Sequence, residues 1–195
     1  MVMVGQMKRG RNSHAVSIID NVDQICPPEP CGLKSRVIGG NGYNQDSILY
    51  EGNEYLEEST DSNAWIGKNG KTGDNAMIKI DLGCEKILNG FYLRNFHSGE
   101  NWKDGTKQFK VTFCDSASSV TSVSEGCQDR IFQLNSISKI NSEKTVFFPL
   151  DPVLSVRKIA IRILTFFGQR GGLHYFRENE KPNPGSSYQG SPIRV

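Results

Sequence analysis

The sequence predicts an all-β protein, built as an antiparallel β-sandwich with a flexible segment at each end. Two observations lead to this fold class. Short stretches of alternating apolar and polar residues recur along the middle of the chain, between turns rich in Gly, Asn, Ser and Asp. No stretch of useful length repeats its apolar residues at the roughly 3.6-residue period of a helix.

The alternation defines the strands that we expect, in chain order. In "KQFKVTFC", Phe109, Val111 and Phe113 fall on one face, and Lys110 and Thr112 fall on the other. "RKIAIRIL" repeats the pattern, with three isoleucines on the inner face. The expected strands are residues 76–82, 87–95, 107–114, 130–134, 144–150, 157–164 and 173–178.

Length and composition indicate one domain with polar ends. Of the 195 residues, 1–35 are expected to be a poorly ordered leader, 36–177 the sandwich domain and 178–195 a flexible tail. A net charge of +2 gives no reason to expect nucleic acid as a partner. No run reaches the about 20 apolar residues of a transmembrane segment, and the N-terminus lacks the apolar stretch of a secretory signal.

The five cysteines leave two redox states open. Cys114 and Cys127 flank the turn between two expected strands, where a disulfide would stabilise the fold by about 3 kcal/mol. A second bond would join Cys26 to Cys31 in "CPPEPC", and the odd count then leaves Cys84 unpaired. The alternative is a set of reduced thiols.

Four stretches carry a resemblance to a known family. They are "STDSNAWIGKNGKTGDNAMIKIDLG" at residues 59–83, "ILNGFYLRN" at 87–95, "GTKQFKVTFCDS" at 105–116 and "VRKIAIRILTFFGQRGGLHYF" at 156–176. Their order and spacing resemble the discoidin domain, also called the coagulation factor V/VIII (F5/8) type C domain, of the galactose-binding-like superfamily. The resemblance covers residues 37–177 and implies a jelly-roll-like sandwich that binds ligands through loops at one end. Because no cysteine follows Cys127, the family's terminal disulfide is missing.

The residues that match the family have mainly structural interpretations. An indole at Trp65 would fill the interior at one end of the sandwich. Asp81, at a strand end, would accept backbone N–H bonds, and Arg162 would either pair with a carboxylate such as Asp81 or be solvated. Gly171 and Gly172 are expected to adopt positive φ in a tight loop.

The stretch "RNFHSGENWKDG", residues 94–105, is the main candidate for ligand binding. It is long for an antiparallel connection, and the resemblance makes it one of the projecting binding loops. Trp102 would stack on a sugar or enter a lipid interface, and its neighbours offer hydrogen-bond donors and acceptors. The alternative is an indole that packs back on its own sandwich. The predicted ligand-binding residues here are Arg94, His97, Asn101, Trp102, Lys103 and Asp104.

A second connection, residues 40–53, adds Tyr43, Asn44 and Tyr50 as predicted ligand-binding residues. Aromatic and amide groups together suit planar, polyhydroxylated ligands, although the same residues suit ordinary loop packing. The turn "GKNGKTG" carries Lys68 and Lys71, which either meet an anionic glycan or headgroup or are simply solvated.

An acidic segment, residues 51–61, raises the question of a metal. It contains five acids and no Lys or Arg, and Asp61 is the predicted ligand of a structural Ca²⁺, a site frequent in the resembled family. The spacing does not match an EF-hand, and a solvated acidic edge is the alternative. No other cofactor is expected.

Catalysis is not expected from this sequence. His14, His97 and His174 are scattered, and no G-x-S-x-G, H-E-x-x-H or P-loop pattern accompanies them. We therefore expect a non-catalytic binding or adhesion module that recognises a carbohydrate or a phospholipid headgroup. The alternative is a structural or protein–protein interaction module. The resemblance implies an extracellular or cell-surface location, whereas the visible N-terminus favours an intracellular or incomplete chain.

Overall fold

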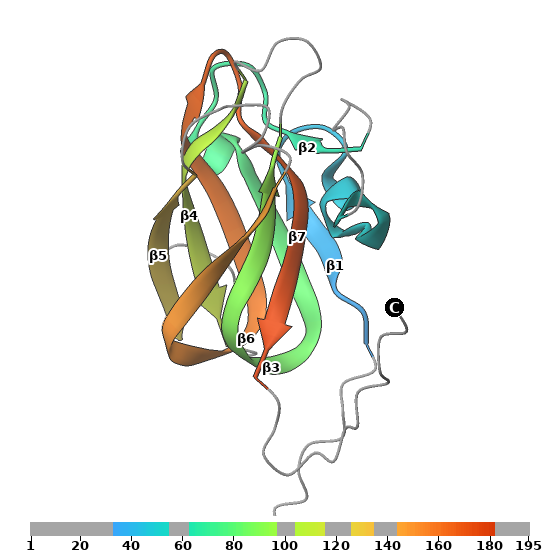
Figure 1. The fold of residues 1–195 in the computed structure, drawn as a ribbon, viewed down its shortest axis with the longest axis vertical. Helices are drawn as coiled ribbons and strands as arrows, with labels where there is room; N and C mark the ends of the chain where they lie inside the picture. The colour runs from blue at the N-terminus through green and yellow to red at the C-terminus, as the bar shows by residue number, and fades with distance from the viewer. Residues whose placement is uncertain (1–32, 55–62, 97–103, 116–125, 135–143, 182–195) are drawn as a thin grey trace, which may run out of the picture.

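The structure is a computed structural model that describes residues 33–54, 63–96, 104–115, 126–134 and 144–181. These residues contain strands and short 3-10 helices (η), in the order shown in Figure 1. The elements are β1 (Arg36–Gly40), η1 (Gln45–Leu49), η2 (Glu51–Glu54), β2 (Trp65–Ile66), η3 (Gly73–Asn75), β3 (Met77–Asn95), β4 (Gly105–Cys114), β5 (Cys127–Gln133), β6 (Thr145–Phe167) and β7 (Gly172–Glu180).

Two long strands, β3 and β6, connect the two layers of the sandwich. All pairings are antiparallel in the order β2-β7-β3-β6-β4-β5, with β1 added beside β3. The β3–β6 pairing shifts register between Asp81 and Lys86 and again between Leu88 and Gly90. Before the first shift β3 pairs with β1, and after it β3 pairs with β7, so the strand passes from one layer into the other. The predicted all-β sandwich is confirmed.

The core forms around Phe91, on the inner side of β3. Its ring contacts Phe148 at 5.2 Å between centroids in a stacked arrangement and Phe132 at 5.1 Å edge-on. Three more phenylalanine rings lie within 6.4 Å of it, namely Phe109, Phe113 and Phe176. The residues that the alternation placed inside are buried as predicted, including the three isoleucines of β6, Ile159, Ile161 and Ile163.

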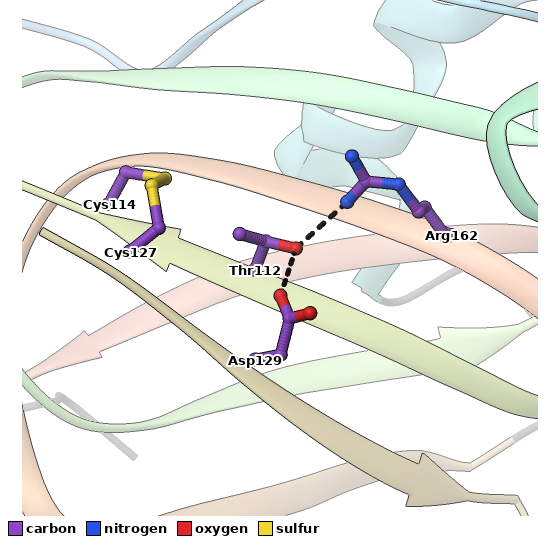
Figure 2. The surroundings of a disulfide bond; sticks show 5 residues. All are labelled: Thr112, Cys114, Cys127, Asp129 and Arg162. Carbon is purple, nitrogen blue, oxygen red and sulfur yellow. Dashed lines mark hydrogen bonds between the residues drawn. A yellow bond between two sulfur atoms is a disulfide. The ribbon is translucent and has the colours of Figure 1, made fainter. Parts of the chain in front are cut away.

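One predicted disulfide is confirmed, and the prediction for Cys84 is wrong. Cys114 and Cys127 lie opposite each other on β4 and β5 and are bonded, as Figure 2 shows. Cys84 is also disulfide-bonded, to a partner outside the described residues. The physical reason is that the chain before β1 passes beside the bend of β3, where a Cβ on Gly83 would come within 2.7 Å of the Leu33 Cβ. Cys26 and Cys31 lie outside the described residues.

The outer face of one layer carries a chain of hydrogen bonds next to this disulfide. Arg162, which is 4% exposed, donates to Thr112 Oγ1 at 2.8 Å, and Thr112 donates to Asp129 Oδ1 at 2.6 Å (Figure 2). The carboxylate that pairs with Arg162 is Asp74, at 2.7 Å. The alternative of Asp81 as this partner is therefore wrong. Asp81 instead accepts the backbone N–H of Gly83 at 2.9 Å, as predicted for a strand end.

A second ionic cluster closes the end of the sandwich where β7 finishes. Lys86 Nζ lies 2.9 Å from Glu178 Oε1 and 2.6 Å from Glu180 Oε1. Ser35, just before β1, donates to Glu178 Oε1 at 2.7 Å. The cluster joins β3, β7 and the entry of the chain into β1, and β7 continues beyond Arg177, where the sequence placed the end of the domain.

Candidate functional site

Several connections meet at the opposite end of the sandwich, the upper end in Figure 1. Gly67 N donates to Gly171 O at 2.9 Å, which joins the segment after β2 to the β6–β7 turn. Tyr43 N donates to Ile66 O at 2.9 Å, which joins the β1–β2 connection to β2. Gly105 N donates to Arg170 O at 3.1 Å, which joins the start of β4 to the same β6–β7 turn. We call this the loop end of the sandwich.

The floor of the loop end is filled by Trp65, as the sequence predicted. Its indole is fully buried and its Nε1–H donates to Asn41 O at 3.0 Å. The prediction for Gly171 and Gly172 is wrong, because neither is among the glycines with positive φ. The two glycines are needed for space: a Cβ on Gly172 would lie 2.4 Å from Trp65 O, and one on Gly171 would lie 2.8 Å from a methyl group of Ile163.

A pair of polar side chains fixes the last rung of the sheet below the β3–β4 connection. Asn95 Nδ2 donates to Thr106 O and its Oδ1 accepts Thr106 N–H, both at 2.9 Å. Thr106 Oγ1 in turn donates to Gly172 O at 2.8 Å. Both side chains are buried, so these bonds are shielded from water and define where the connection leaves β3 and enters β4.

Arg170, in the β6–β7 turn, holds both ends of that connection. Its guanidinium lies 5.6 Å from the ring centre of Phe96, the last described residue before the connection. Its Nε lies 3.3 Å from Asp104 Oδ2, on the first described residue after it. The other oxygen of Asp104 accepts Gln169 N–H at 2.9 Å. A single arginine therefore contacts both roots of residues 97–103.

Replacing Arg170 by Gln is therefore expected to increase the local opening of residues 97–103. We expect only a small effect on the free energy of unfolding of the whole domain. The variant loses the charge that pairs with Asp104 and contacts Phe96, while the Asn95–Thr106 bonds below remain. Hydrogen exchange measured by mass spectrometry should become faster in peptides that cover residues 97–103. An exchange rate equal to that of the unmodified protein would contradict this role. The matched control is Arg157→Gln on β6, which should leave exchange in these peptides unchanged.

Arg94 and the β1–β2 connection are joined in the interior. Arg94 is 2% exposed and its Nη1 donates to Asn53 O at 3.2 Å. Asn53 is fully buried, and its Nδ2 lies within donor distance of the carbonyl oxygens of Ser47 at 2.7 Å, Asn63 at 2.8 Å and His174 at 3.1 Å. Arg94 thus supports the connection from inside, and its role in ligand binding stays a prediction.

The other predicted ligand residues fall into four groups. Tyr43 is 59% exposed at the loop end, next to Asn44, which has a left-handed backbone with φ 52. Tyr50 is 65% exposed, between η1 and η2. Asp104 is engaged with Arg170 and Gln169, as described above. His97, Asn101, Trp102 and Lys103 lie outside the described residues, so their roles stay predictions.

The described residues contain neither a candidate metal cluster nor a candidate membrane-spanning helix. Among the described residues, no group of three or more His, Cys, Asp or Glu side chains is placed to hold a metal ion. Asp61 lies outside that part of the chain, and calcium binding there stays a prediction. No helix in the described ranges is long and apolar enough to cross a bilayer.

The fold is shared with solved domains that have little sequence in common with this chain. No family model matches the chain, and no curated protein matches it by sequence. A family 32 carbohydrate-binding module from a family 31 glycoside hydrolase of Clostridium perfringens superposes with a TM-score of 0.51 at 11% identity, over 76% of this chain and 92% of that one. The corresponding module of Streptococcus pneumoniae EndoD gives 0.50 at 15%, over 75% and 96%. An F5/8 type C domain of a Bacteroides fragilis protein gives 0.50 at 13%, over 76% and 91%.

Proposed function

We propose that this chain, which has the galactose-binding-like discoidin fold, is a non-catalytic carbohydrate-binding module whose ligand contacts the loop end. The observation that carries the proposal is the anchoring of both roots of the β3–β4 connection on Arg170. Two of the similar solved domains are described as carbohydrate-binding modules, which supports the ligand class. The fold alone does not imply function, so the contacts at this end of the sandwich carry the assignment.

Fixed loop roots at this end would favour sugar binding, which is weak for each contact made. A sugar exchanges hydrogen bonds with water for hydrogen bonds with protein, so the net gain per contact is small. A connection whose roots are already fixed loses less conformational entropy when the ligand binds. Aromatic side chains then add apolar contact with the face of a pyranose ring. Tyr43, exposed at this end, and Trp102 are the aromatic residues that we assign to this role.

The disulfides support an extracellular or cell-surface setting. The Cys114–Cys127 bond and the bond at Cys84 are both of a kind that persists in oxidising compartments. The unreduced protein should therefore be lighter by four hydrogens than the reduced protein in a mass spectrum.

An interaction with another protein is the second candidate function, and an exposed apolar strip favours it. On the outer face of β3 and β6, Phe147 is 40% exposed and packs on Tyr92 with 5.0 Å between ring centroids. Ile87 and Val153, farther along the same two strands, are 51% and 42% exposed. This strip lies on a sheet face and not at the loop end, so variants can separate the two functions.

Trp102→Ala is expected to weaken glycan binding by about 30-fold, which corresponds to about 2 kcal/mol, the loss typical of an aromatic contact at the centre of an interface. The measurement is a glycan array followed by titration calorimetry with the best ligand, in calcium and in EDTA. Phe147→Ala is the matched control, since it removes an exposed aromatic ring from the strip described above. The melting temperature of Trp102→Ala should stay close to that of the unmodified protein.

Other outcomes would lead to a different assignment. Binding to phosphatidylserine vesicles and to no glycan would place the ligand among lipid headgroups. Absence of binding to every glycan and vesicle would contradict the proposal and favour the protein-interaction module. A large fall in the melting temperature of Trp102→Ala would mean that the indole packs on its own sandwich.

A further inference from the structure

We infer that the loop end selects acidic carbohydrates, those bearing a carboxylate or a sulfate, through a rim of lysines around the β6–β7 turn. The inference rests on the proposed function and names the class of its ligand. The lysine rim consists of Lys68 and Lys71 in the turn after β2, and Lys107 at the start of β4.

The backbone holds the first two of these lysines beside the β6–β7 turn. Gly67 N donates to Gly171 O at 2.9 Å and Gly70 N donates to Gln169 O at 3.0 Å, so the two turns run side by side. Gly70 has φ 68, a left-handed conformation that glycine adopts without strain. Lys68 and Lys71 are both exposed. Their backbone positions are therefore fixed before any ligand arrives.

The third lysine approaches the same turn from β4. Lys107 is exposed, and its Nζ lies 5.9 Å from the ring centre of Phe167, the last residue of β6. Thr106, the residue before it, donates a hydrogen bond to the carbonyl oxygen of Gly172, the first residue of β7. The rim thus has lysines on two sides of the β6–β7 turn, after β2 and at the start of β4.

The carboxylates next to the rim are already paired with arginines. Asp74, which follows Lys71, pairs with Arg162 at 2.7 Å, and a hydrogen bond from Arg162 and its charge hold the pKa of Asp74 below its ordinary value. Asp104 pairs with Arg170 at 3.3 Å. No described carboxylate is paired with a lysine of the rim, so these cations remain available to an anionic ligand.

Among the described residues, the other acids near this end lie away from the lysine rim. Residues 97–103 carry one acid and one lysine, and so do residues 135–143. The described acids of the β1–β2 connection include Asp46 in η1 and Glu51 at the start of η2, and η1 packs on β7 and β1. The turn with Lys68 and Lys71 instead lies next to the end of β6 (Figure 1). Asp46 and Glu51 therefore lie on a different part of the loop end from Lys68 and Lys71.

Several exposed lysines acting together are needed for such selectivity. A single exposed ion pair contributes little, because water and salt screen it. A group of like charges around one turn produces a field that attracts an anion, and its effect falls as ionic strength rises. Salt dependence therefore distinguishes this recognition from the stacking of an aromatic residue on a neutral sugar.

The test compares lactose, sialyllactose and sulfated lactose at low and high sodium chloride. We expect the acidic sugars to bind about tenfold more tightly than lactose at low salt, with the preference shrinking as salt rises. Lys68→Glu combined with Lys71→Glu should abolish that preference. Lys34→Glu combined with Lys181→Glu is the matched control, because it changes the net charge equally at the opposite end and should leave the preference unchanged.

The outcomes separate this inference from the proposed function. Equal, salt-independent binding of all three sugars would overturn the lysine rim while keeping the carbohydrate-binding module. Loss of the preference in the control pair as well would also overturn it, since net charge alone would then account for the effect. Failure to bind any sugar here or on the glycan array would contradict the proposed function itself.

Discussion

Replacing Lys86 by Met is expected to lower the free energy of unfolding by about 3 kcal/mol, the loss typical when one partner of a buried ion pair is removed. Lys86 and Glu178 have side chains that are only 10% and 13% exposed. Without the ammonium group, Glu178 keeps its hydrogen bonds from Ser35 and from its own backbone N–H, but its charge stays largely desolvated. Urea unfolding at neutral pH measures the effect.

The same pair predicts how stability changes with pH. Burial raises the pKa of Glu178, but hydrogen bonds from Lys86 and Ser35 outweigh this effect and set the pKa below its ordinary value. The stabilisation is therefore complete above the unfolded-state pKa of about 4.3, and it is lost as pH falls through the folded-state value. Burial lowers the pKa of Lys86, yet the bonds to Glu180 and Glu178 raise it overall. That contribution is present below an unfolded-state pKa of about 10.4 and is lost as pH rises through the folded-state value.

A double variant gives the control for both effects. Lys86→Met combined with Glu178→Gln removes the buried charge together with its partner, so we expect it to be more stable than Lys86→Met alone. Its stability should also vary less below about pH 4.3, since Glu178 no longer titrates. If Lys86→Met unfolded at the same urea concentration as the unmodified protein, the cluster would have no net role in stability.

Phe91→Ala is expected to destabilise the fold by about 4 kcal/mol, within the range measured when a buried aromatic residue is truncated. Phe91 is fully buried at the centre of five other rings, which come from β4, β5, β6 and β7. The cavity would therefore lie where the two layers meet, and rigid strands on every side limit its collapse.

Phe91→Leu is the comparison variant and should cost clearly less, because it leaves a smaller cavity. Phe147→Ala, on the exposed face of β6, should cost least of the three. Thermal or urea unfolding of this series measures the order. A loss below about 1 kcal/mol for Phe91→Ala would mean that the ring cluster repacks around the missing side chain.

Alternation in the sequence predicted the buried faces but not the continuity of the strands. Phe109 and Ile161 are inside because every second residue of a half-buried strand points to the core. The segments around 77–82 and 87–95 were expected as two strands, because Gly83 and its neighbours read as a turn. They form one strand, β3, with a register shift, since bulges bend a strand without ending it. Likewise, the segments 144–150 and 157–164 were expected as two strands and form one strand, β6.

At the loop end, the sequence identified Trp65 but missed Arg170 and Asn53, and it gave Gly172 the wrong role. Trp65 was recognised because a buried indole is distinctive. Arg170 and Asn53 carry no local pattern, and their contacts join segments far apart in the chain. The role of Gly172 depends on the distance to Trp65 O, which becomes visible only when the strands are paired. The family resemblance correctly indicated the sandwich. For Cys114 and Cys127 the sequence left a disulfide and reduced thiols open, and the structure has the disulfide.

The bond between Ser35 and Glu178, 2.7 Å long, has a consequence for how this domain can be mounted. It places the entrance to the first strand and the exit from the last one at one pole, opposite the proposed binding surface. Polypeptide joined at either side would therefore depart from the pole that faces away from the sugar. A fusion partner could be attached there, or the domain inserted in tandem with others, with its recognition surface still pointing outward.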